Sequence, residues 1–116
     1  MKRKAVQPRS IERVLAKRMR AQAGVHHSVY VVYLRNPSGD GKAGYYVGMT
    51  GLTPERRLAN YKAGTKAARV VKRFGERLVP KLYVHLNPMT YLEALAMEKR
   101  LAEELRGRGF QVFGGT

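Results

Sequence analysis

Side chains that could act on a phosphodiester recur in order along this chain. Tyr30 and Tyr46 lie in two segments rich in β-branched and aromatic residues, Arg57 and Tyr61 follow four residues apart, and Glu98 comes much later. Residues four apart share one face of a helix, so the side chains of Arg57 and Tyr61 should lie together. Phenols on two strands, a guanidinium and a lone carboxylate form a credible set for cutting a phosphodiester with one metal ion.

Glu98 is the most informative of these residues, because it falls on the apolar face of an expected helix over residues 90–106. At about 100° per residue, its neighbours on that face are Tyr91, Ala94, Leu95, Leu101, Ala102 and Leu105. An unpaired carboxylate on a packing face is costly, so Glu98 needs a cation, a metal ion or a set of hydrogen-bond donors. Two alternatives stay open from the helix alone: a buried ion pair with an arginine, or a functional carboxylate.

The inward-facing cation of the first helix after the strands is expected to be Arg57. It shares a face with Tyr61 beside Leu58, whereas Arg56 points elsewhere. A guanidinium suits a phosphate oxygen, because it stays charged and offers paired donors. The alternative is an arginine on a basic helix that is solvated or only positions phosphate.

The strand tyrosines are predicted to divide between the two faces of a sheet. Tyr33 faces the side opposite to Tyr30, and Tyr45 and Tyr46 point opposite ways. Taken alone, each is more readily explained as an amphipathic core residue. Gly48 allows close approach of backbone or ligand, with a bulge or a tight strand exit as the alternative.

The composition predicts one folded domain with a polyanionic partner. The chain has 116 residues, 44% of them hydrophobic, and its 23 Lys and Arg against 8 Asp and Glu give a formal charge of +15. A surface this basic favours nucleic acid over an acidic protein or a membrane. The sequence has no cysteine, no run of about 18 apolar residues and no apolar stretch behind its basic start. A cytoplasmic protein without a membrane partner is therefore expected, and its oligomeric state stays open.

The positive charge is concentrated in two segments. Residues 1–24 carry eight Lys and Arg against one acid, and residues 56–75 carry seven with no acid. We expect these segments to contact nucleic-acid phosphates. The candidate nucleic-acid-binding residues are Lys17, Arg20, Gly48, Arg56, Lys62, Lys66, Arg69, Lys72 and Arg73. The three histidines lack metal-ligand spacing and are predicted to be noncatalytic.

Turn, capping and hydrophobic signals predict an α+β fold. Strands are expected at 28–35, 44–49 and 82–86, and helices at 11–21, 54–63, 65–74 and 90–106. The expected caps are Ser10, Thr53 with Pro54, Thr65, and a capping box from Thr90 to Glu93. The alternating segment 110–113 is expected to pack onto the sheet. The predicted architecture is a small three-stranded antiparallel sheet flanked by helices over 25–116, with a basic N-terminal arm and an extra short helix over 1–24.

These pieces, in this order and spacing, resemble the catalytic module of the GIY-YIG nuclease superfamily. The similar positions are Val29-Tyr30 for the first family tripeptide, Tyr46-Val47-Gly48 for the second, and then Arg57, Tyr61 and Glu98. The match covers residues 28–105. It departs from the family pattern at Ser28, which replaces the first glycine, and at Met49, where repair-type members carry a lysine.

The resemblance implies hydrolysis with a single metal ion. Glu98 would hold Mg²⁺ or Mn²⁺, and Arg57 would neutralise charge on the phosphoryl group. Tyr30 or Tyr46 would orient or deprotonate the attacking water, and the choice between them stays open.

The expected function is a divalent-metal-dependent endonuclease that cuts DNA with low sequence specificity. Single-stranded and branched DNA are among its candidate substrates, and affinity should come mainly from phosphate contacts. Two alternatives stay open: a nucleic-acid-binding module with an inactive site, and a basic adaptor that docks on an acidic protein. The sequence does not decide between DNA and RNA.

Overall fold

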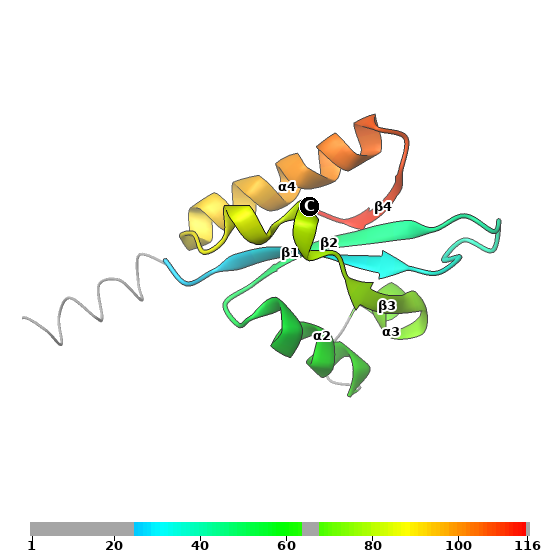
Figure 1. Ribbon diagram of the computed structural model, residues 1–116, viewed down its shortest axis with the longest axis horizontal. Coiled ribbons are helices and arrows are strands. Elements are labelled where there is room, and N and C mark those ends of the chain that lie inside the picture. The colour runs from blue at the N-terminus through cyan, green and yellow to red at the C-terminus, as the bar shows by residue number, and fades with distance from the viewer. Residues whose placement is uncertain (1–24, 64–67, 116) are drawn as a thin grey trace, which may run out of the picture.

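The computed structural model describes residues 25–63 and 68–115, and Figure 1 shows how they are arranged. The strands and α-helices are β1 (Ser28–Leu34), β2 (Gly44–Thr50), α2 (Pro54–Lys62), α3 (Arg69–Phe74), β3 (Gly75–Leu78), α4 (Tyr91–Gly107) and β4 (Gln111–Gly114). The predictions that lie outside the described residues are the helix 11–21 with its cap Ser10, the cap Thr65, and the contacts Lys17, Arg20 and Lys66. In the described part of the chain, no helix is both long and apolar enough to cross a membrane.

A four-stranded mixed sheet forms the centre of the fold, in the order β3-β1-β2-β4. β1 and β2 form the predicted antiparallel hairpin, with Tyr30 opposite Gly48 and Val32 opposite Tyr46. β3 is antiparallel to β1, whereas β4 is parallel to β2. The α+β class and the packing of the C-terminal segment on the sheet are confirmed. The prediction of three antiparallel strands is wrong both in the number of strands and in the direction of β4.

The segment 82–86, which was expected to be the third strand, forms no strand. Two short 3₁₀ helices, η1 (Pro80–Leu82) and η2 (Val84–Leu86), occupy this region. Pro80 has no backbone N–H and a fixed φ, so it suits the first turn of a helix better than a strand ladder. The strand beside β1 is instead β3, whose Glu76 and Arg77 are exposed. Charged side chains are common on an edge strand, and they interrupt the hydrophobic alternation by which a strand is predicted from sequence.

The predicted helix starts at Thr53 and Thr90 are confirmed. The Oγ atom of Thr53 accepts a hydrogen bond of 3.1 Å from the backbone N–H of Arg56. Thr90 and Glu93 form the reciprocal capping box, with bonds of 2.9 and 3.1 Å. The helices α2 and α4 end within one residue of the predicted positions. In the described residues α3 begins at Arg69, later than predicted.

Helices cover the sheet from two sides. Figure 1 shows α4 on one side of the strands and α2 and α3 on the other. Both alternating sets of β1 side chains are buried: Val29 and Val31 on one face, Tyr30 and Val32 on the other. The Tyr30 face is the one that meets α2, because its hydroxyl bonds to that of Tyr61. The core therefore fixes Tyr30 between the sheet and α2.

Candidate active site

Three tyrosines from three elements meet on the α2 side of the sheet. The hydroxyl oxygens of Tyr30 and Tyr61 are 2.8 Å apart and share a hydrogen bond. The ring centroid of Tyr46 lies 6.4 Å from that of Tyr30 and 6.2 Å from that of Tyr61. Tyr33 and Tyr45 instead contact each other, with centroids 6.4 Å apart. The predicted division of the strand tyrosines between the two faces is confirmed.

Gly48 makes room for the phenol of Tyr30. A Cβ atom at Gly48 would lie 2.5 Å from the Tyr30 hydroxyl oxygen and 2.6 Å from its ring atom Cζ. Gly48 pairs with Tyr30 across the hairpin and is buried, so the ring lies over the glycine. The sequence left open close approach of backbone or ligand, or a bulge or strand exit, and the structure shows neither at Gly48. The side chain of Tyr30 occupies the space over this glycine.

Gly48→Ala is therefore expected to destabilise the protein by about 1–3 kcal/mol, because the new methyl group has to displace the Tyr30 ring. Urea denaturation of the purified variant measures the loss. The matched control is Gly107→Ala, since a Cβ at Gly107 meets no atom of the described residues within 4 Å. Equal stability of the two variants would show that the Tyr30 ring moves away from Gly48 without cost.

Arg57 lies against the tyrosine cluster, as predicted. Its guanidinium carbon is 4.7 Å from the centroid of the Tyr61 ring, and the residue is partly buried, whereas Arg56 is exposed. The Nε atom of Arg57 is buried and has no hydrogen-bond partner among the described residues. A buried donor without an acceptor is uncommon, and a phosphate oxygen would satisfy it.

The side chain of Glu98 is partly buried and forms no ion pair or hydrogen bond with any described residue. Burial raises the pKa of its carboxyl group above the ordinary value. Burial and Tyr61 raise the pKa of Tyr46 most, and the negative charge of Glu98 raises it further, so this carboxylate acts electrostatically on the Tyr46 phenol. The buried ion pair that the sequence left open is not observed among the described residues, and Glu98 has the free coordination positions that a metal ligand needs.

The apolar face predicted around Glu98 is only partly correct. Ala94, Leu101, Ala102 and Leu105 are buried. Tyr91 and Leu95, however, are 48% and 40% exposed. The sheet and the C-terminal strand cover the later turns of α4, and the described chain leaves the outer side of its first turns open to solvent.

The side chains of the site offer few ligands to a metal ion. In the ranges that the structure describes, no group of three or more His, Cys, Asp or Glu residues could hold a metal ion. Glu98 therefore supplies one carboxylate. Mg²⁺ tolerates such a site, because it keeps several water ligands and is often bound by one or two carboxylates together with substrate phosphate. The residues fit an open metal site that substrate completes.

The phenols of Tyr30 and Tyr46 differ in how exposed they are. Burial, and then the hydrogen bond and charge of Tyr61, raise the pKa of Tyr30 well above its ordinary value. The pKa of Tyr46 is raised as well, first by burial and then by its interaction with Tyr61. Both hydroxyl groups are therefore protonated at neutral pH. Tyr30 is 1% exposed and already bonded, whereas Tyr46 is only partly buried, so Tyr46 is the phenol that a substrate can reach.

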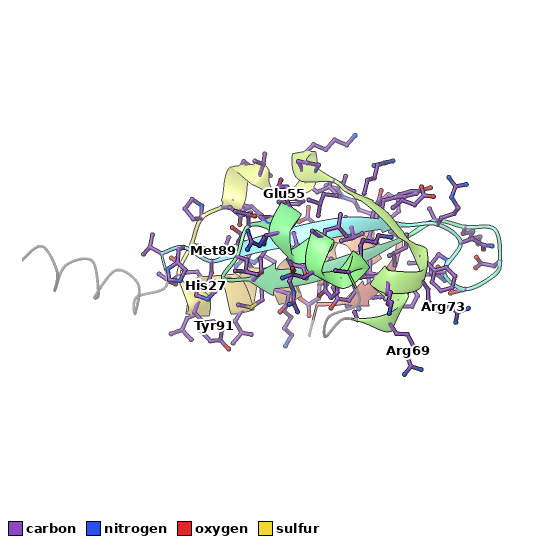
Figure 2. All side chains as sticks on the ribbon, turned by 90° about the horizontal axis from the view of Figure 1, so that it is seen from below. His27, Glu55, Arg69, Arg73, Met89 and Tyr91 are labelled. Atoms are coloured by element: carbon purple, nitrogen blue, oxygen red, sulfur yellow. The ribbon has the colours of Figure 1, made fainter. Side chains whose placement is uncertain are left out.

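The predicted phosphate contacts on α2 and α3 are mostly exposed cations. Arg56, Arg69, Lys72 and Arg73 are exposed, and Figure 2 shows Arg69 and Arg73 on the half of the described residues away from His27 and Tyr91. Lys62 differs, because its Nζ donates a hydrogen bond to the backbone carbonyl of Gly75 and so joins α2 to β3.

Asn87 is a positioning residue that the sequence analysis did not identify. Its Oδ1 accepts a hydrogen bond of 2.9 Å from the Val29 N–H, and its Nδ2 donates one of 2.8 Å to the Val29 carbonyl. These bonds fix the backbone next to Tyr30. The only local signal was an Asn-Pro pair, which predicts a turn and does not name the strand it contacts.

Comparisons of the chain with models of protein families, with characterised proteins and with solved structures find no match. Function is therefore inferred from the geometry of the site itself. That geometry combines three phenols from separate elements with a partly buried carboxylate and a guanidinium Nε, neither of which has a partner in the part of the chain that the structure describes.

Proposed function

We propose that this protein is a divalent-metal-dependent endonuclease of the GIY-YIG type, which hydrolyses phosphodiester bonds in DNA with low sequence specificity. The observation that carries the proposal is Glu98, a partly buried carboxylate without a partner among the described residues. It interacts with Tyr46, whose ring is 6.2 Å from that of Tyr61, and the Tyr61 ring lies under the guanidinium of Arg57. A partly buried carboxylate without a partner costs folding free energy when it is ionised. A purely structural role for Glu98 does not explain that cost.

Each residue of the proposed site has its own role in hydrolysis. Arg57 binds a phosphate oxygen and offsets the negative charge that develops on the phosphoryl group. Tyr46 contacts the attacking water or the phosphate and orients it. Glu98 is the protein ligand for Mg²⁺ or Mn²⁺, and such an ion when bound stabilises the leaving oxygen and acidifies water. Tyr30 and Tyr61, bonded to each other, hold Tyr46 and Arg57 in place.

The two strand phenols are expected to respond differently to removal of the hydroxyl group. Tyr46→Phe should lower kcat for cleavage by about 100-fold or more with little change in stability, because the hydroxyl contacts the reacting groups. Tyr30→Phe breaks the bond to Tyr61, so it should cost about 1 kcal/mol of unfolding free energy and change the rate less. Cleavage kinetics and urea denaturation of both variants measure this. A folded Tyr30→Phe variant without activity, beside an active Tyr46→Phe variant, would reverse the assignment.

Cleavage of end-labelled single-stranded, duplex and branched DNA, with Mg²⁺, with Mn²⁺ and with EDTA, tests the function. Metal-dependent products are the expected result. Tight binding of these molecules without cleavage of any would favour the alternative, a nucleic-acid-binding module with an inactive site. The absence of a multi-residue metal cluster in the described residues is the observation that favours this alternative.

A further inference from the structure

Exposed apolar and aromatic side chains gather near the start of β1 and α4. We define the end surface as Val25, His26, Leu52, Tyr91 and Leu95. Val25 is 50% exposed, Leu52 46%, Tyr91 48% and Leu95 40%, and His26 is exposed as well. Large apolar side chains exposed together on a small protein usually mark a binding site.

Contacts between rings connect the parts of the end surface. The His26 and His27 rings have centroids 4.7 Å apart, and His27 meets the edge of Tyr91 at 5.5 Å. Val25, His26 and Leu52 line an open pocket of about 690 Å³, and Arg56 contributes a cation to its wall. The surface is thus continuous from this pocket to the first turn of α4.

The end surface leads toward the proposed metal ligand. Tyr91, Leu95 and Glu98 are spaced by four and three residues on α4, so they follow one another along the same side of the helix. Figure 2 shows His27 and Tyr91 close together near one end of the described residues, with Arg69 and Arg73 toward the opposite end. A polynucleotide that binds along the protein therefore meets cations at one end and rings at the other.

Duplex DNA fits this arrangement poorly. Its bases are stacked and paired, so they offer no free faces to exposed rings, whereas unpaired bases stack on aromatic side chains beside a cationic track. A second copy of this chain is disfavoured as the occupant, because each copy carries a formal charge of +15.

We propose that the end surface binds unpaired nucleobases next to the scissile phosphate, so that the substrate is single-stranded or carries a single-stranded arm. This inference rests on the proposed nuclease function and specifies its substrate class. The rings of Tyr91 and His26 stack on bases, and Val25, Leu52 and Leu95 provide apolar contact.

The test is binding measured without cleavage. Fluorescence anisotropy in EDTA gives dissociation constants for a labelled single strand and for the same strand annealed to its complement. Tyr91→Ala should weaken binding of the single strand about fivefold or more and leave duplex binding within about twofold. Tyr91→Phe, which keeps the ring, should bind as wild type does. Leu92→Ala is the matched control, because Leu92 is 72% exposed on the same helix turn but points about 100° away.

The outcomes separate this inference from the nuclease proposal. Equal weakening of single-stranded and duplex binding by Tyr91→Ala, or no weakening, would overturn the base-binding surface while leaving the nuclease site untouched. Wild-type protein that binds neither form would contradict the proposed function itself. A loss confined to the single strand, absent in Tyr91→Phe and Leu92→Ala, is the result that supports base stacking.

Discussion

Arg57→Lys is expected to reduce the rate of DNA cleavage by about 100-fold or more, with binding of DNA reduced much less. A lysine keeps the charge but has neither the planar fork nor the Nε donor, which in Arg57 is buried and bonds to no described residue. The guanidinium also lies 4.7 Å from the Tyr61 ring centroid, a position that a flexible ammonium does not hold. Because donors aimed at developing charge act mainly in the transition state, the loss should appear in kcat.

The adjacent residue provides the control for Arg57. Arg56→Lys makes the same chemical change on the same helix at an exposed position. We expect its cleavage rate to stay within about threefold of wild type, since an exposed cation contributes by general attraction to phosphate. Steady-state cleavage kinetics of both variants at equal ionic strength give the comparison. Similar losses in the two variants would mean that Arg57 is only part of the basic surface.

Glu98→Gln is expected to have opposite effects on activity and stability. Cleavage should fall by about 1,000-fold or more, because the amide cannot replace an ionised carboxylate as a ligand of a divalent cation. Unfolding free energy at neutral pH should rise, because the variant no longer holds an unpaired charge in a partly buried position. Binding of DNA in EDTA should be unchanged.

The pH dependence of the unfolding free energy tests whether the charge of Glu98 destabilises the folded protein. Its pKa is raised in the folded protein, so the folded state binds the proton more tightly than the unfolded state does. Stability therefore falls as pH rises through the ordinary carboxyl pKa and up to the raised value. The difference between Glu98→Gln and wild type should be greatest above this window and vanish below it. Glu103→Gln, which makes the same chemical change on the exposed side of α4, is the control. A wild type that is more stable than Glu98→Gln at neutral pH would indicate a satisfied structural carboxylate.

Local signals account for what the sequence predicts well. The hairpin follows from two β-branched and aromatic segments around a dense turn, and the helix starts follow from Thr53 and from the Thr90–Glu93 box. The division of tyrosines between two faces follows from strand alternation alone. Arg57 and Tyr61 meet because they are four residues apart on α2.

The remaining features depend on contacts between distant parts of the chain. β3 has four residues, of which Glu76 and Arg77 are charged, so only its pairing with β1 identifies it. The parallel pairing of β4 with β2 depends on where α4 ends relative to the sheet. The exposure of Tyr91 and Leu95 reflects what covers α4, which a helical wheel cannot show.

The most direct test of the central claim is incubation of circular single-stranded DNA with wild-type protein and with Glu98→Gln protein prepared in parallel, in Mg²⁺, in Mn²⁺ and in EDTA. A circle has no ends, so only an endonuclease can open it. We predict linear products from wild type with either metal ion, none in EDTA, and none from the variant although it binds the DNA equally well. Cleavage by Glu98→Gln at the wild-type rate, or by wild type in EDTA, would contradict a site built on Glu98 and a divalent metal ion.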